Sequence, residues 1–334
     1  MGRVPDQPPG PSVKRQPTEK RKRTPIEERG QAIVDRLRNG GTPLQKRRLA
    51  AAEPRIGVAL GGGAARGLTH IPYIEAMDEM GLRPSVISGT SIGALIGAGW
   101  ANGMTGAELH DHACDVLGTM KVIASRLWAA QIRNLGGLIQ NGFNVQLDAT
   151  RIVENFLPDS FPAEFRDLKV PLYVVATDFQ SWHQTVFNEG PLRDAIAGSI
   201  AIPSLFKPVA FANHLLVDGG VVNPLPLDQA DIDTDILVGI DVNGEPSELI
   251  GKTDHRMLDV WFGSAQIMMH SLTAQMMAAY PPDVYVRPRV QSFGALEFWR
   301  VREIIEHARK DKDNFKRQLG RKVEAFILAQ QKSL

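Results

Sequence analysis

Short apolar runs and segments of helical periodicity start to alternate at Arg55. Residues 55–60 form an apolar run typical of a buried strand, and three glycines end it before a helix that extends to about Met80. A second apolar run at residues 84–88 leads into a turn at 89–93 and then into a helix of small residues. This order of strand, helix, strand and helix predicts a parallel sheet with helices on its faces.

The rest of the chain continues this mixture and contains no internal repeat. Residues 105–165 have mostly helical periodicity, with a Gly/Asn-rich interruption near 135–142. Further short strands are expected at residues 170–177, 184–187, 207–210, 215–217, 235–241 and 283–287. Helices are expected at residues 191–201, 257–279, where methionine is frequent, and 296–331, which are amphipathic. The predicted class is α/β.

The charge of the chain is uneven. Residues 1–53 carry 13 Lys/Arg and 6 Asp/Glu, so this arm has a charge of about +7, although the whole chain has +1. Residues 1–25 are rich in Pro, Lys and Arg, which is typical of disorder, while 26–50 predict short, weakly amphipathic helices. Three interpretations of the basic run at 20–23 stay open: a solvated tail, attraction to anionic lipid headgroups and, with the least support, nucleic-acid binding.

Composition bounds the compartment and the cofactors. The single cysteine, Cys114, excludes an internal disulfide framework and suits a reducing compartment. No basic-then-apolar signal opens the chain, and the most apolar window, residues 86–101, is too short and too Gly-rich to span a bilayer. We therefore expect a cytoplasmic protein with at most peripheral membrane attachment. Cys, His and Asp lack metal-ligand spacing, so neither a catalytic metal nor a cofactor is expected. The sequence does not indicate an oligomeric state.

The turn at residues 89–93 reads Gly-Thr-Ser-Ile-Gly, a G-x-S-x-G pentapeptide. A serine on a sharp strand-to-helix turn needs glycine two positions before and after it, because the helix crosses close to the strand. Such a turn would expose Ser91 at the carboxyl end of the sheet and at a helix N-terminus, where an oxyanion is stabilised. The bland alternative is a Gly-rich turn with an ordinary N-cap serine.

A glycine-rich loop, residues 61–67, directly follows the first predicted strand. Successive glycines let backbone N–H groups converge on an anion, as the oxyanion of acyl transfer requires. A nucleotide-phosphate loop is the rival, but Arg66 stands where G-x-G-x-x-G requires its third glycine, and no G-K-[ST] is present. Arg66 would either orient the loop through hydrogen bonds to the backbone or face an anionic substrate group.

Asp218 is the candidate base. It follows the apolar run at 215–217 and precedes two glycines, which places a carboxylate at a strand end, although a turn-forming Asx residue is the bland alternative. None of the histidines has such a setting: His70, His110, His112, His183, His214, His255, His270 and His307. His270 lies in the Met-rich helix and is expected to be a satisfied core histidine.

Taken together and in this order, these motifs resemble the patatin-like phospholipase family. The resemblance spans roughly residues 55–245 and includes Ala-Gly-Ser-Ile-Ala-Ile-Pro at 197–203, followed by Phe206 and Pro208. It implies a three-layer α/β/α fold with a mostly parallel central sheet, and a Ser–Asp dyad without histidine. The implied site residues are the nucleophile Ser91, the base Asp218, the oxyanion-hole residues Gly61, Gly62 and Gly63, and the supporting residues Arg66, Gly67, Gly89, Gly93, Gly219 and Gly220.

The resemblance also implies a function and a domain plan. Its substrates would be phospholipids, lysophospholipids or glycerides, and an anionic membrane surface would be a partner of the arm. An esterase or thioesterase on small soluble acyl groups, and a non-catalytic lipid-binding regulator, stay open as alternatives. The expected parts are a basic, partly disordered arm at 1–53, the hydrolase domain at 54–290 and a C-terminal amphipathic helical extension at 291–334.

Overall fold

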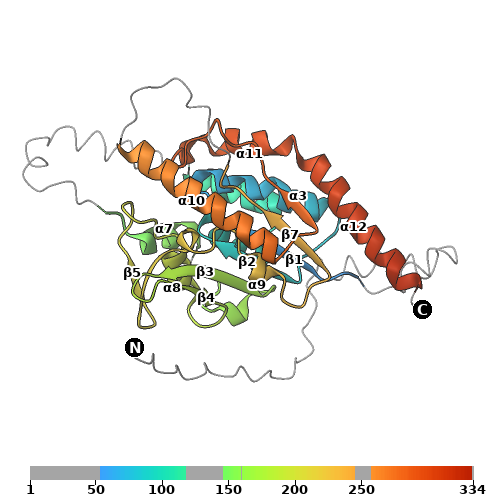
Figure 1. Cartoon of the computed structure of the whole chain (residues 1–334), viewed down its shortest axis with the longest axis horizontal. Helices are drawn as coiled ribbons and strands as arrows, with labels where there is room; N and C mark the ends of the chain where they lie inside the picture. Colours follow the sequence, from blue (N-terminus) through green and yellow to red (C-terminus); the bar gives the residue numbers. More distant parts are fainter. Residues whose placement is uncertain (1–52, 118–145, 159, 245–256, 333–334) are drawn as a thin grey trace, which may run out of the picture. The chain divides into compact units, whose positions relative to one another are not determined.

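A computed structural model describes residues 53–117, 146–158, 160–244 and 257–332 (Figure 1). The described strands form one eight-stranded sheet, in which hydrogen-bonded neighbours follow the order β5-β6-β3-β2-β1-β7-β8. β4 also pairs with β3, on the edge opposite β2 and β6. In chain order the strands are β1 (Ile56–Leu60), β2 (Val86–Thr90), β3 (Leu172–Asp178), β4 (His183–Phe187), β5 (Val209–Phe211), β6 (His214–Asp218), β7 (Ile236–Ile240) and β8 (Val284–Val286). The pairs from β3 through β2, β1 and β7 to β8 are parallel, whereas β4, β5 and β6 pair antiparallel. The sheet is therefore mixed and mostly parallel, as predicted.

The described helices lie between these strands and after the last of them. The α-helices are α3 (His70–Glu79), α4 (Ile92–Ala101), α7 (Ala149–Phe156), α8 (Leu192–Ser199), α9 (Leu227–Ala230), α10 (Met257–Ala279), α11 (Val301–Arg309) and α12 (Lys312–Lys332). Residues 106–117 are also helical, and the short 3₁₀ helices are η1 (Ala64–Thr69), η2 (Phe165–Asp167), η3 (Gly219–Val221) and η4 (Phe298–Arg300). The chain thus alternates strands and helices, which is the α/β class that the hydrophobic pattern predicts.

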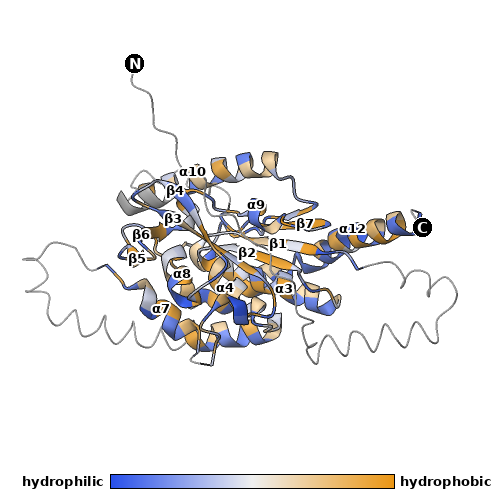
Figure 2. Ribbon diagram, turned by 90° about the horizontal axis from the view of Figure 1, so that it is seen from below, coloured by the Kyte–Doolittle hydropathy of each residue, from blue (hydrophilic) through white to orange (hydrophobic). Residues whose placement is uncertain are grey.

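Helices cover both faces of the sheet, with α9 and α10 on one side and α3, α4 and α8 on the other (Figure 2). Strand alternation explains this division, because successive side chains of β1 point to opposite faces. Ile56, Val58 and Leu60 lie in the main hydrophobic core, whereas Ala59 lies in a second cluster with Leu227 of α9. A strand that is buried on both faces reads as a continuous apolar run, which is why β1 could be recognised from its sequence.

The C-terminal residues share the main core with the sheet. Ile304 and Ile305 of α11 and Phe315 and Leu319 of α12 are fully buried in that core. The hydrophobic pattern of these helices is therefore satisfied by packing against the domain itself. None of the described helices is long and apolar enough to cross a membrane. Residues 1–52 of the predicted N-terminal arm lie outside the described residues.

Candidate active site

Strand pairing explains why Ser91 and Asp218 meet. β2 and β6 both overlap β4 in their pairing with β3, so both must lie on the side of β3 that is opposite β4. β2 runs parallel to β3 and β6 antiparallel, so their carboxyl ends approach each other along the same side. Thr90 pairs with Val175, and Asp218 pairs with the next residue, Ala176. The residue after β2 and the last residue of β6 therefore lie side by side.

Ser91 occupies the strained turn that the pentapeptide predicts. Its backbone has φ 56° and ψ −125°, a conformation that costs a non-glycine residue free energy and is found at functional turns. A Cβ atom at Gly93 would lie 2.1 Å from the Leu60 carbonyl oxygen, and one at Gly89 would lie 2.6 Å from the Ala94 Cα atom. Both glycines are therefore required for the close crossing of α4 over β1 and β2.

The hydroxyl of Ser91 donates a hydrogen bond to Asp218 Oδ2 over 2.6 Å. Asp218 is buried, and its other oxygen accepts from the Gly220 N–H over 2.8 Å. Burial raises the pKa of Asp218 to about 6, although the hydrogen bonds from Ser91 and Gly220 oppose this shift. A carboxylate with a pKa close to neutrality that already accepts from a hydroxyl can act as a general base.

The two glycines after Asp218 fix its position. A Cβ atom at Gly219 would lie 2.2 Å from the Val175 carbonyl oxygen, so only glycine allows η3 to pass this close to β3. Thr177 Oγ1 donates to the Asp218 carbonyl over 2.9 Å from the same strand. The predicted Asp-Gly-Gly motif thus holds its carboxylate against the end of β2.

The glycine-rich loop lies beside Ser91, but two of its N–H groups are already engaged. Gly61 N donates to the Ile240 carbonyl over 3.0 Å, and Gly62 N donates to the Pro224 carbonyl over 2.9 Å. Of the three glycines predicted as oxyanion-hole residues, only Gly63 has an N–H group for which the described residues provide no acceptor. The described residues offer no hydrogen-bond partner to the N–H groups of Gly63, Ala64 and Ile92. Ala64 and Ile92 line the same cavity as Ser91.

Arg66 is buried and binds backbone carbonyls. Its Nε donates to the Phe293 carbonyl and its Nη1 to the Asn243 carbonyl, each over 2.9 Å. Of the two roles left open by the sequence, this geometry matches orientation of the loop. Gly67 is required next to it, because a Cβ atom there would lie 2.1 Å from the Ile92 Cγ2 atom.

Two further residues support the site, and the motifs did not assign them a role. Ser199 Oγ accepts from the Ser91 N–H over 2.9 Å and donates to the Val175 carbonyl over 2.6 Å. His70 is fully buried, with Nε2 2.9 Å from the Gly61 carbonyl, and burial lowers its pKa to about 4. His70 is thus neutral near pH 7, which lets Nε2–H donate to the loop. Ser199 lies in the segment 197–203 that carried the resemblance, whereas no sequence signal marked His70.

The remaining histidines do not contact the pair. No described histidine makes a hydrogen bond to Ser91 or Asp218. The expectation that His270 is a core histidine is wrong: its side chain is exposed and its Nδ1 lies 3.2 Å from Arg287 Nη2. The Met-rich pattern of α10 misled here, because this face of the helix is turned to solvent. His255 lies outside the described residues.

An apolar cavity of about 660 Å³ opens beside Ser91. Apart from Ser91, the lining side chains are all hydrophobic, and they are Ala64, Leu68, Ile92, Leu95, Leu117, Leu147, Ile152, Phe156, Ile200, Ile202, Leu205, Phe206, Leu296, Phe298 and Trp299. Its size is within the range of small-molecule sites. Within the described part of the chain, no three His, Cys, Asp or Glu side chains are grouped to hold a metal ion.

Known proteins resemble large parts of this chain. An uncharacterized NTE family protein of Mycobacterium tuberculosis is 31% identical over 207 residues, which are 60% of this chain and 53% of that protein. Lysophospholipase NTE1 of Pyricularia oryzae is 23% identical over 278 residues, which are 75% of this chain and 18% of that protein. The chain thus spans about half the length of the mycobacterial relatives that it matches.

Among solved structures, the chain is similar to VipD from Legionella pneumophila, with a TM-score of 0.42 and 14% identity over 79% of this chain and 67% of that one. The sequence profile described as patatin-like phospholipase matches residues 58–231, more than half of the 334 residues. The matched range contains the glycine-rich loop, Ser91 and Asp218. The chain therefore belongs to the patatin-like phospholipase family.

Proposed function

We propose that this protein hydrolyses carboxylic ester bonds of acyl lipids, with Ser91 as nucleophile and Asp218 as general base. The observation that carries the proposal is the 2.6 Å hydrogen bond from the Ser91 hydroxyl to Asp218 Oδ2. A nucleophile within hydrogen-bond reach of a base is the arrangement that covalent catalysis requires. The pKa of about 6 supports the same role, since a base works best when its pKa is close to the operating pH.

The proposed reaction has two steps. Asp218 accepts the Ser91 proton as Oγ attacks the ester carbonyl, and the developing oxyanion is stabilised by N–H groups of Gly63, Ala64 and Ile92. Asp218 then returns the proton to the leaving alcohol, which departs and leaves an acyl-enzyme. A water molecule gives its proton to Asp218, attacks the acyl carbonyl and releases the fatty acid, and the proton goes back to Ser91.

The cavity supports a lipid acyl chain over a small soluble acyl group. A short acyl group would leave most of the apolar lining exposed to water, whereas a fatty acyl chain would cover it and gain free energy from burial. The name of the Pyricularia relative, lysophospholipase, makes a lysophospholipid the first substrate to test.

The experiment is a substrate panel with wild type and Ser91→Ala in parallel. We expect wild type to release fatty acid from at least one of lysophosphatidylcholine, phosphatidylcholine and monoacylglycerol, and the alanine variant to release none. Hydrolysis of soluble butanoyl esters or thioesters alone would favour the small-substrate alternative. A wild type with no turnover but with saturable lipid binding would identify a regulator and refute the proposal.

A further inference from the structure

A segment outside the family-matched residues forms one wall of the cavity. Residues 293–299, which we call the strap, lie between β8 and α11. Two hydrogen bonds tie the strap to η1, the helix that follows the glycine loop: Ala65 N donates to the Ala295 carbonyl, and Arg66 Nε donates to the Phe293 carbonyl, each over 2.9 Å. The Phe293 side chain is buried in the main core. The beginning of the strap is therefore fixed against η1, whose first residue, Ala64, lines the cavity together with Ser91.

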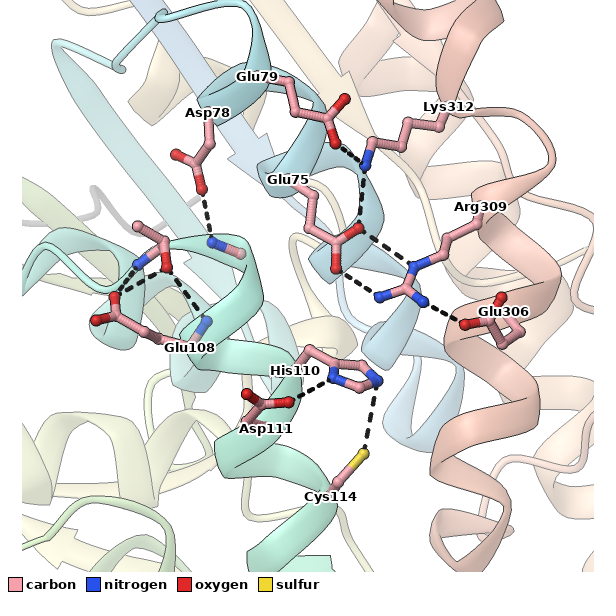
Figure 3. Close-up of polar contacts among 12 residues, drawn as sticks. Glu75, Asp78, Glu79, Glu108, His110, Asp111, Cys114, Glu306, Arg309 and Lys312 are labelled. Atoms are coloured by element: carbon pink, nitrogen blue, oxygen red, sulfur yellow. Dashed lines mark hydrogen bonds and ion pairs between the residues drawn. The ribbon is translucent and has the colours of Figure 1, made fainter.

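The other end of the strap continues into helices that are anchored on α3 (Figure 3). Glu75 of α3 accepts two hydrogen bonds from Arg309, the shorter being 2.8 Å, and one from Lys312 over 3.2 Å. Burial alone would raise the pKa of Glu75, but the hydrogen bonds from these two cations outweigh it and lower the pKa. Glu79 also binds Lys312 and Lys316. The Glu75–Lys312 pair is largely buried, whereas Glu79 is half-exposed. Together these ion pairs connect α11 and α12, which follow the strap, to α3.

Three apolar side chains near the end of the strap line the cavity: Leu296, Phe298 and Trp299. Trp299 is 56% exposed and Leu296 is 38% exposed, whereas Leu95 and Leu117 of the same cavity are almost fully buried. The strap therefore borders the open end of the cavity. An exposed tryptophan that lines an apolar cavity gains free energy when an apolar ligand covers it.

We propose that the strap determines acyl-chain selectivity, and that Trp299 is its main contact with the distal carbons of a long chain. This inference rests on the proposed function, since it assumes that the chain of an ester bound at Ser91 follows the cavity. On this proposal a butanoyl group is covered mainly by the buried side chains of the cavity, such as Leu95. A dodecanoyl group would cover Trp299, so removal of this side chain penalises long substrates selectively.

The test compares wild type, Trp299→Ala and Leu296→Ala on 4-nitrophenyl esters from butanoate to hexadecanoate. For Trp299→Ala we expect kcat/KM to fall about 10-fold on the dodecanoate, the scale of a lost apolar contact, and to change less than about 2-fold on the butanoate. Trp182→Ala is the matched control, because Trp182 is 83% exposed in the turn between β3 and β4 and does not line the cavity. It should change neither value.

A second measurement separates this inference from the proposed function. Calorimetry with dodecanoate, the product acid, needs no turnover, and Trp299→Ala should bind it about 10-fold more weakly than wild type does. Equal binding by the two proteins, or an equal loss of kcat/KM at every chain length, would overturn the role of the strap. Dodecanoate binding that depends on Trp299 in a protein without esterase activity would refute the proposed function alone. If Trp299→Ala lowers the melting temperature, Leu296→Ala and Trp299→Phe replace it in the same assays. Leu296→Ala should reduce the preference for the dodecanoate over the butanoate, and Trp299→Phe should retain it.

Discussion

The proposed Ser91–Asp218 dyad and the strap both contribute to one cavity, Ser91 from the dyad and Leu296, Phe298 and Trp299 near the end of the strap, but the two regions are built in different ways. Ser91 and Asp218 lie at the buried ends of two strands, where a Cβ atom at Gly93 or Gly219 would collide with backbone. The strap is a partly exposed segment. One backbone hydrogen bond, one hydrogen bond from the Arg66 side chain and the ion pairs of the following helices hold it in place. We thus propose that the reaction takes place at Ser91 and Asp218, where the backbone is tightly packed. Selectivity would depend on the strap, where side chains have more room to move.

Ser91→Ala should give the largest effect. The change removes the proposed nucleophile, so ester hydrolysis should fall by about 10⁴ or more. Only one buried hydroxyl is lost, so the melting temperature should stay close to that of wild type. Steady-state rates with thermal melts check this. Ser271→Ala, a change on the exposed face of α10, is the control and should keep full turnover. Substantial turnover in the Ser91 variant would show that another residue attacks the ester.

Asp218→Asn should lower turnover by about 10³ to 10⁴, because an amide cannot accept the serine proton. It should also stabilise the fold at pH 8. Since the folded pKa of Asp218 is raised to about 6 from an ordinary value of 3.8, the native state binds more protons than the unfolded state between about pH 4 and 6. Stability is therefore lost as the pH rises through this window, and removing the buried charge should restore about 3 kcal/mol. Urea denaturation at pH 8 measures it.

Asp178→Asn provides the opposite case. Hydrogen bonds from His214 and Ser181 hold the pKa of Asp178 below its ordinary value, so its charge stabilises the fold above pH 4. This variant should be less stable than wild type at pH 8 but keep most of its turnover. If both aspartate variants were less stable than wild type at pH 8, the buried charge of Asp218 would not be destabilising as we propose.

Gly62→Ala tests whether the proposed nucleophile, Ser91, needs the free space next to Gly62. The new Cβ atom would lie 3.4 Å from the Ser91 Cβ atom, at the short end of ordinary contact, so the fold should tolerate it while the Ser91 side chain has less room to take up its attacking position. A misplacement of this kind lowers kcat by about 10². Gly63→Ala is the comparison, because its Cβ atom would lie 2.5 Å from the Val242 carbonyl oxygen and should lower the melting temperature. Normal kcat in Gly62→Ala would remove the loop from the reaction.

The pH dependence of the wild type is a smaller effect. Asp218 must be ionised to accept a proton, so kcat/KM should rise with pH and level off above a midpoint near pH 6. His70→Gln, which keeps a donor for the Gly61 carbonyl, should leave that midpoint unchanged, because the His70 pKa of about 4 lies far below it. A midpoint that moves with His70 would point to a histidine base.

Removal of residues 1–50 should have the smallest effect on turnover. These residues belong to neither region of the comparison, so hydrolysis of soluble esters should stay within about 2-fold. Binding to anionic vesicles should weaken, because each basic residue near such a surface contributes about 1 kcal/mol. Co-sedimentation at low and high salt measures this, and equal binding with and without the arm would refute it.

Sequence patterns predicted the dyad better than its surroundings. The pentapeptide around Ser91 and the glycines after Asp218 are local motifs, because each belongs to a single tight turn. The apolar runs of β1 and β7 are also local, and they identify strands that are buried on both faces. The meeting of the two side chains depends on β2 and β6 sharing one side of β3, which is long-range information. The support from His70 and the strap is also long-range, so no local pattern indicated either.

The most direct test of the dyad is the site and rate of labelling by an alkyl fluorophosphonate, mapped by mass spectrometry. We predict one adduct, on Ser91, and labelling of Asp218→Asn that is slower by about 10² or more, since the probe needs the same activated hydroxyl. Asp178→Asn should label at the wild-type rate. An adduct on any other serine, or an undiminished rate in Asp218→Asn, would contradict a Ser91–Asp218 dyad.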